Sequence, residues 1–162
     1  RSWRARAPGR AARSRSSPPR ARFAPTVLVV DATVLATALA DDGSDGDRAR
    51  KRLRTEDIAA PEVIDLEVAS VLRRHASLGR LDRRRAELAL ADLVDLPMAR
   101  VPHRPLLGRC WDLRQNLSVY DAAYIALAEV LDASLLTADA RLAKAPGIRC
   151  TVEVVGTDPQ RR

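Results

Sequence analysis

Short apolar segments alternate with helix-compatible segments along most of this 162-residue chain, and this alternation constrains its fold more than any other feature. Residues 27–30 (VLVV) form a β-branched apolar run typical of a buried strand, and residues 32–40 after it suit a helix. Four further short strands are predicted at IAAP (58–61), MARVP (98–102), SLLT (134–137) and TVEVV (151–155). Strands that alternate with helices predict an α/β fold whose parallel sheet is covered by helices on both faces.

The segments between these strands carry the patterns and end signals of helices. Pro61 suits the first turn of a helix over 61–79, and Gly79 suits the position just after its end. Ser118 is a good N-cap for a long helix over 118–133. After a break at DDGSDGD (41–47), the remaining predicted helices cover residues 47–57, 80–97, 104–117 and 138–146.

The net charge of +7 is concentrated at the N-terminus. Residues 1–22 contain eight arginines and no acid, which leaves 20 basic and 21 acidic residues in the rest of the chain. Residues 1–25 mix Arg, Ala, Ser and Pro without periodicity, so we expect a disordered basic arm, followed by one domain over 26–156 and a disordered tail over 157–162. Because Met98 is the only methionine, it stays open whether this arm lies upstream of the true start site.

Several classes of protein are excluded by composition. Aromatic residues make up 3% of the chain, too few for a base-stacking RNA platform, and Cys110 and Cys150 form no CxxC pair that would indicate a zinc site. No apolar run reaches about 18 residues and no signal peptide is evident, so a cytoplasmic protein without membrane association is predicted. The segment from Asp41 resembles the start of an EF-hand loop, but its twelfth position is Arg52, where a Glu is needed.

Four carboxylates fall where sites form in parallel α/β sheets, at the carboxyl ends of strands and the first turns of helices. Asp31 directly follows VLVV, Asp139 comes two residues after SLLT, Asp121 lies three residues after Ser118, and Glu67 lies on an apolar helix face. Helix capping is the alternative for the three aspartates. Clustered carboxylates repel one another unless a divalent cation neutralises them, and hard oxygen ligands suit Mg²⁺ or Mn²⁺. A metal held in this way favours phosphoryl chemistry.

The segments VVDATVL, DLEVASVLRR, YDAAYIALAE and LLTADARL resemble the four acidic motifs of PIN-domain ribonucleases, specifically the VapC-type toxins of toxin–antitoxin pairs, over about residues 27–155. The resemblance implies a PIN-like three-layer α/β/α sandwich with a central parallel sheet of about four to five short strands. It also implies a set of catalytic and metal-ligating acids and a supporting hydroxyl, namely Asp31, Glu67, Asp121, Asp139 and, for the hydroxyl, Thr137.

The function implied by this resemblance is that of a toxin, a Mg²⁺- or Mn²⁺-dependent endoribonuclease that hydrolyses RNA phosphodiester bonds. Its implied partners are RNA, a cognate VapB-type antitoxin and a second copy of the chain. The alternatives are a catalytically silent PIN-like module for RNA binding or dimerisation, and a PIN nuclease of RNA maturation without an antitoxin. Possible RNA contacts, each also compatible with a solvated helix face or with ordering of a loop, are Arg73, Arg74, Arg114 and Asn116.

Overall fold

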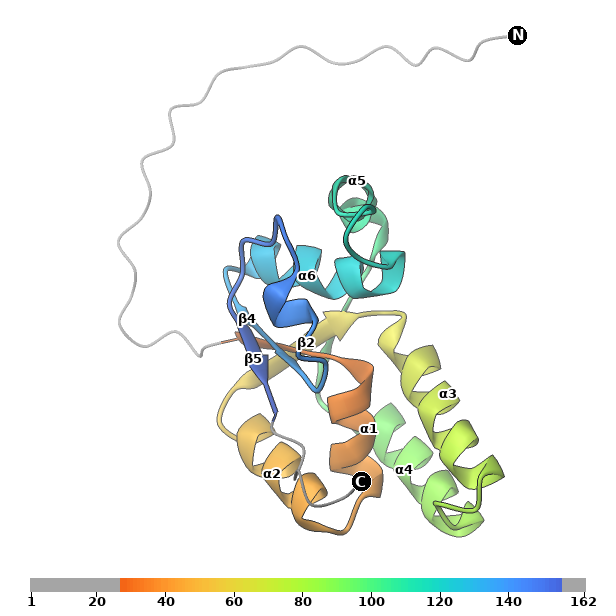
Figure 1. Cartoon of the computed structure of the whole chain (residues 1–162). Coiled ribbons are helices and arrows are strands. Elements are labelled where there is room, and N and C mark those ends of the chain that lie inside the picture. The colour runs from red at the N-terminus through yellow and green to blue at the C-terminus, as the bar shows by residue number, and fades with distance from the viewer. Residues whose placement is uncertain (1–26, 156–162) are drawn as a thin grey trace, which may run out of the picture.

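The computed structural model describes residues 27–155, in which a five-stranded parallel sheet forms the centre (Figure 1). The predicted arm and tail lie outside these residues. The strand order is β3-β2-β1-β4-β5, and neighbouring strands are parallel throughout. The strands are β1 (Val27–Val30), β2 (Asp57–Pro61), β3 (Ala99–Val101), β4 (Ser134–Thr137) and β5 (Val152–Val154). The five predicted strands are therefore confirmed.

Helices cover both faces of the sheet and give the predicted three layers (Figure 1). On one face lie α1 (Ala32–Ala40), α2 (Ser44–Leu53), α3 (Ile64–Ser77) and α4 (Arg83–Asp95). On the other lie α5 (Leu107–Asp112) and α6 (Val119–Leu131). None of the helices in the described part of the chain is long and apolar enough to cross a membrane.

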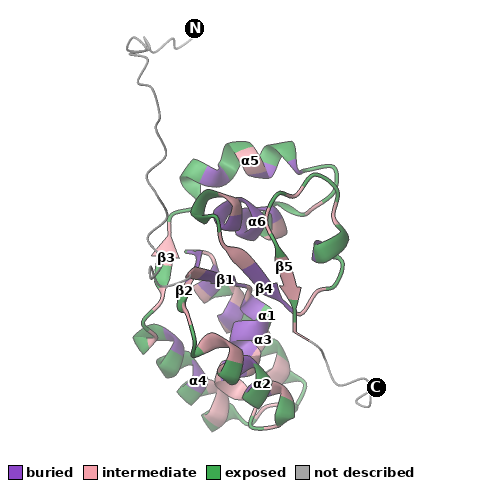
Figure 2. Cartoon of the chain, turned by 90° about the vertical axis from the view of Figure 1, so that its left-hand side faces the viewer, coloured by how far each residue is buried: buried purple, intermediate pink, exposed green. Residues whose placement is uncertain are grey.

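The core lies where β1 and β4 meet α1 and α6 (Figure 2). Leu28, Val29 and Val30 are fully buried because strands in the middle of a parallel sheet are covered on both faces. Residues 122–128 of α6 are all buried as well, since this helix packs on the sheet with its inner side and under α5 with its outer side. This burial explains why α6 is apolar around most of its circumference.

Two predicted helices are wrong in extent. Residues 138–146 contain only a 3₁₀ helix at Leu142–Lys144, because the Asp139 carboxylate accepts a hydrogen bond from the Arg141 backbone N–H (2.8 Å) and forms a tight turn instead. Residues 104–117 split into a 3₁₀ helix at Arg104–Leu106, with Pro105 in its first turn, and the short α5.

Two helix starts also differ from the prediction. α2 begins at Ser44 inside the predicted break, where the Asp41 carboxylate accepts hydrogen bonds from the backbone N–H groups of Gly43 and Gly46. A Cβ atom at Gly46 would lie 1.8 Å from the Asp41 carbonyl oxygen, so only glycine fits there. Pro61 is the last residue of β2 rather than part of α3, whereas Gly79 ends α3 with a φ of 66° as predicted.

Candidate functional site

Asp31 lies at the carboxyl end of β1, the central strand of the sheet, and its backbone N–H donates to the Leu136 carbonyl of β4. The strand order reverses here, because the chain places β2 on one side of β1 and β4 on the other, which is where parallel α/β sheets form their sites. The Asp31 Oδ1 accepts a hydrogen bond from the Val34 backbone N–H (2.9 Å), and its Oδ2 accepts one from the hydroxyl of Thr137 at the end of β4. Thr137 is fully buried on the neighbouring strand β4, and its hydrogen bond fixes the position of the Asp31 carboxylate.

Glu67 lies in the first turn of α3 and is half-buried. Its Oε2 accepts a hydrogen bond from the hydroxyl of Tyr124, a buried residue of α6 on the opposite face of the sheet from α3. Sequence reasoning missed Tyr124 as a site residue, although it lies one turn after Asp121 on the same helix. The three-residue spacing from Asp121 is the sequence signal that places Tyr124 on the same helix face.

Asp121 lies in the first turn of α6, and its position is set by the helix cap. The Ser118 hydroxyl accepts a hydrogen bond from the Asp121 backbone N–H (3.1 Å) and donates one to the Asp121 Oδ2 (2.8 Å). Ser118 therefore caps α6 as predicted, but the Asp121 carboxylate accepts from the Ser118 hydroxyl and from no described backbone N–H. Asp31, in contrast, caps α1 with its own side chain, which accepts from the Val34 N–H. Capping leaves acceptor capacity on each carboxylate, so it does not exclude binding to a cation.

Asp139 has a different environment, because it is paired with a cation. The Arg141 Nε lies 3.0 Å from both carboxylate oxygens of Asp139, and the Arg141 Nη2 lies 2.6 Å from Oδ2. This hydrogen-bonded arginine lowers the pKa of Asp139.

Three of the four predicted acids, Asp31, Glu67 and Asp121, lie close enough for the charges of two of them to raise the pKa of the third. Burial raises the pKa of Asp31, and burial followed by the charges of Asp121 and Asp31 raises the pKa of Glu67. Burial and the Glu67 hydrogen bond raise the pKa of Tyr124, which therefore stays protonated as a donor. We call Asp31, Glu67 and Asp121 the three-acid cluster; Asp139 is turned toward Arg141 instead.

The three-acid cluster has the chemistry of a Mg²⁺ or Mn²⁺ site, since its donors are hard carboxylate oxygens. In residues 27–155 no Lys, Arg or His forms an ion pair with any of its members. Within the same residues, no three His, Cys, Asp or Glu side chains converge closely enough, as they stand, to hold one ion. The donor set therefore fits a divalent cation, and binding would require the carboxylates to draw together.

The structure separates the two arginines of α3 that were predicted to contact RNA. Arg74 lines a groove of about 260 Å³ between α1 and α3, together with Arg80 and with Thr33, two residues after Asp31. Arg73 lies on another side of α3 and lines a shallow hollow toward α4 with Arg83. Of the two, only Arg74 lines the groove between α1 and α3, and none of the four predicted acids lines it.

The other two predicted RNA contacts lie after α5. The Arg114 guanidinium lies over the Trp111 ring, 4.8 Å from its centroid, and donates a hydrogen bond to the Trp111 carbonyl. The Asn116 Nδ2 donates to the Pro146 carbonyl oxygen at 3.2 Å. These contacts order the loop between α5 and α6, and a role in RNA binding stays a prediction.

Comparison with known proteins agrees with this geometry. The PIN domain model matches residues 28–148. The chain is 40% identical over 129 residues to VapC ribonuclease Mb0985 of Mycobacterium bovis, covering 80% of this chain and 98% of that protein. It is 41% identical over 128 residues to ribonuclease VapC1 of Mycobacterium tuberculosis, covering 78% and 96%. This chain belongs to the VapC ribonucleases of the PIN-domain family. The crystal structure of PAE2754 from Pyrobaculum aerophilum has the same fold, with 26% identity, a TM-score of 0.57 and coverage of 80% of this chain and 84% of that one.

Proposed function

We propose that this chain is the toxin of a toxin–antitoxin pair, an endoribonuclease that hydrolyses RNA phosphodiester bonds with Mg²⁺ or Mn²⁺ bound by its acids. The observation that supports this most strongly is the three-acid cluster, which has no cationic partner among the described residues and lies at the switch point of the sheet. The chain is also 40% identical to a VapC ribonuclease. Asp31 and Asp121 are the first metal ligands in this proposal, with Glu67 and Asp139 beside them.

Each acid of the cluster is oriented by a hydroxyl group of the chain itself. Thr137 donates a hydrogen bond to Asp31, Tyr124 to Glu67 and Ser118 to Asp121. One oxygen of each carboxylate is held in this way, and the remaining lone pairs stay available to an ion when the three acids draw together. A bound divalent ion supplies an activated water and stabilises the leaving oxygen, so no covalent protein nucleophile is needed.

The groove between α1 and α3 supports a path for RNA along α3, away from the acids. It begins at Thr33 and ends at Arg74 and Arg80, at the far end of α3 from Glu67. Arginine binds phosphate through paired N–H groups, so these two residues would contact the RNA backbone at a distance from the phosphate being cleaved.

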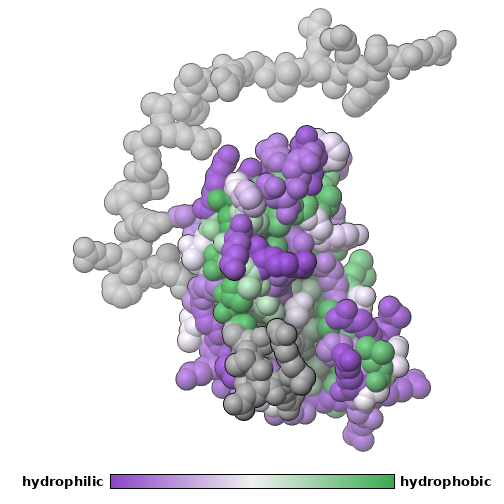
Figure 3. All heavy atoms as spheres, viewed as in Figure 1, coloured by the Kyte–Doolittle hydropathy of each residue, from purple (hydrophilic) through white to green (hydrophobic). Residues whose placement is uncertain are grey.

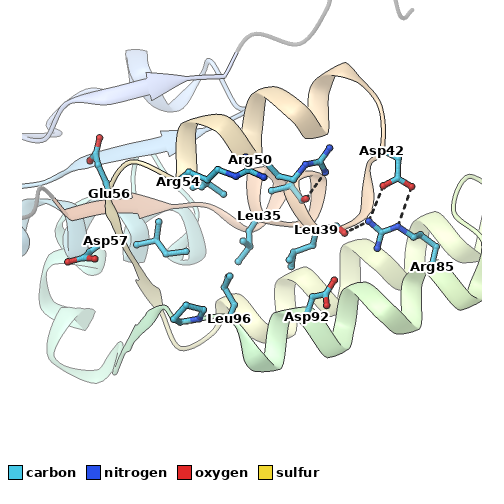
Figure 4. Close-up of a pocket in the computed structure, with 14 residues that line it drawn as sticks. Leu35, Leu39, Asp42, Arg50, Arg54, Glu56, Asp57, Arg85, Asp92 and Leu96 are labelled. Carbon is cyan, nitrogen blue, oxygen red and sulfur yellow. Dashed lines mark hydrogen bonds and ion pairs between the residues drawn. The ribbon is translucent and has the colours of Figure 1, made fainter.

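A second groove, of about 680 Å³, supports the proposal of an antitoxin partner (Figure 4). Leu35 and Leu39 of α1 point toward Leu96 after α4 and line it with apolar surface. At one end, Arg85 donates hydrogen bonds to the Leu39 carbonyl and to the Asp42 carboxylate. An apolar floor with a charged rim suits an amphipathic segment of a partner protein. The crystal structure of VapBC2 from Rickettsia felis has a similar fold, with 10% identity, a TM-score of 0.59 and coverage of 80% of this chain and 98% of that one. It contains VapBC2 bound to a DNA fragment from their promoter.

The complete proposal places the toxin in the cytoplasm, as a homodimer that is kept inactive by a VapB-type antitoxin. It requires no membrane association.

RNA cleavage by the purified full chain tests this proposal. We expect cleavage with Mn²⁺ and none after chelation by EDTA, and we expect Asp121→Asn to lower the rate by about a hundredfold or more, because the amide keeps the shape but removes the charge that holds the ion. Asp82→Asn is the matched control, since Asp82 caps α4 through the backbone N–H groups of Arg84 and Arg85. Cleavage that persists in EDTA would exclude the metal mechanism. Unchanged cleavage by both Asp31→Asn and Asp121→Asn would make the acids structural, and an inactive wild-type chain would favour the silent binding module.

A further inference from the structure

Arg141 is the one cationic side chain that forms an ion pair with any of the four predicted acids within residues 27–155. It lies in the loop after β4, at the same edge of the sheet as Asp31 and Thr137. The charge of Asp121 also acts on it, so its guanidinium lies within the field of two of the acids.

The side chain of Arg141 is 89% exposed although it is held by Asp139. Its Nε and Nη2 contact the Asp139 carboxylate, while its Nη1 makes no hydrogen bond to any described residue. An ion pair this exposed is weak, because water and salt screen it, and it can be exchanged for another anion.

Ordering of the loop does not require this guanidinium. The turn at residues 139–141 is made by the Arg141 backbone N–H, which donates to the Asp139 Oδ1 at 2.8 Å, and the Asp139 backbone N–H donates to the Thr137 hydroxyl at 3.0 Å. Both hydrogen bonds remain when the Arg141 side chain is removed. The Arg141 guanidinium is therefore not needed to form the turn. It places a positive charge at the edge of a site whose proposed substrate is an anion.

We propose that Arg141 binds a phosphate group of the RNA at the acid edge, and that Asp139 keeps its guanidinium in place until the phosphate replaces the Asp139 carboxylate as its partner. The inference rests on the proposed function, since it takes RNA as the substrate. A phosphodiester that approaches the three-acid cluster is repelled by its charges, and a planar guanidinium beside the cluster offsets that repulsion with paired N–H donors. Exchange releases Asp139, whose oxygens then become available at the acid site.

Steady-state kinetics with a short RNA in Mn²⁺ test the binding role. We expect Arg141→Ala to raise KM about tenfold with a smaller effect on kcat, and Arg141→Lys to recover part of the loss, because lysine keeps the charge without the paired donors. Arg83→Ala is the matched control: Arg83 is 91% exposed and pairs with Glu87 on α4. Without RNA, the rise in melting temperature caused by Mn²⁺ should be at least as large in Arg141→Ala as in the wild type. An unchanged KM, or the loss of the Mn²⁺ effect, would overturn the proposal.

Metal-free RNA binding tests the exchange between Asp139 and phosphate. In EDTA, Asp139→Asn should bind the RNA more tightly than the wild type, because it frees the guanidinium, and this gain should disappear when Arg141→Ala is also present. An equal gain in both backgrounds would show that Asp139 acts only through its negative charge and would contradict the exchange. These measurements need no cleavage, so a chain that binds RNA through Arg141 but does not cleave it would contradict the proposed function alone.

Discussion

Two single residues, Asp31 and Glu67, lower the stability of the folded protein when no metal is bound. Asp31 and Glu67 have a raised pKa in the folded protein because burial disfavours their charged forms, and Glu67 is also repelled by Asp121 and Asp31. A group whose pKa is higher in the folded than in the unfolded state stabilises the fold below its unfolded pKa, and this stabilisation is lost as the pH rises through the folded pKa. At neutral pH both carboxylates therefore lower the stability of the metal-free protein.

Asp31→Asn should remove the part of this pH dependence that comes from Asp31, while the Glu67 part remains. In EDTA at pH 7, we expect the variant to melt at a higher temperature than the wild type, and the difference should vanish as the pH falls toward the ordinary pKa of 3.8. The cap itself is preserved, since Asn and Asp are nearly equal as N-caps, so its change costs only a few tenths of a kcal/mol. Thermal unfolding from pH 4 to 8 provides the measurement, with Asp82→Asn as a control for the cap. A wild type that is more stable than Asp31→Asn at pH 7 in EDTA would contradict this account.

Whole helices and strands were predicted well where local signals determine them. The β-branched run of β1, the Ser118 cap of α6 and the Gly79 end of α3 all depend on neighbours in the sequence, and the structure confirms them. The segment 138–146 was predicted as a helix from its composition, but the Asp139 carboxylate competes for backbone N–H groups and stops it.

The sequence predicts where the acids lie in the fold but not which side chains pair with them; their role as a site stays a prediction. Acids at the strand ends could be identified from the sequence because parallel strands place them at one edge. The Tyr124–Glu67 hydrogen bond joins residues 57 apart in the chain, and its formation depends on how α3 and α6 approach across the sheet. The ion pair between Asp139 and Arg141 could not be predicted from the sequence either, because it depends on side-chain rotamers in an irregular loop.

The start of α6 links helix stability to the site. Ser118→Ala should destabilise the protein by about 1 kcal/mol through loss of the cap, and it should also reduce RNA cleavage because Asp121 loses the hydroxyl that orients it. Asp82→Ala removes the cap of α4 and should cost a similar free energy of unfolding without changing cleavage. Denaturant unfolding and cleavage rates of the two variants check this. Equal activity in both would show that Ser118 acts on stability alone.

At the scale of the whole molecule, the sheet brings the predicted site residues together from distant parts of the chain. Asp31 follows β1, Glu67 begins α3, Asp121 begins α6 and Thr137 ends β4, and the parallel order places all four at the carboxyl edge. Outside this edge, hydrophobic residues interrupt the hydrophilic surface seen in Figure 3, including its upper part, where α5 and α6 lie.

The outer face of α5 is where we expect the proposed homodimer to form. Leu107 and Trp111 are four residues apart on this helix, so they share a face, and they are 49% and 65% exposed. Exposed apolar pairs that contain Trp are typical of interface centres, and truncating such a residue weakens association by about 2 kcal/mol or more. Light scattering should give the mass of two chains for the wild type and of one chain for Trp111→Glu at low micromolar concentration.

The matched control for this dimer prediction is Val94→Glu. Val94 lies on α4 and is 73% exposed, so the same charge there is equally accessible to water but lies in the opposite layer of the sandwich. This variant should keep the mass of two chains. Both variants should melt close to the wild type when compared as monomers at high dilution, since neither side chain is buried in the described core. If the dimer persists in Trp111→Glu but dissociates in Val94→Glu, the interface lies in the layer of α1–α4 and not on α5. The groove proposed for the antitoxin lies in that layer, so dimerisation and antitoxin binding would then compete.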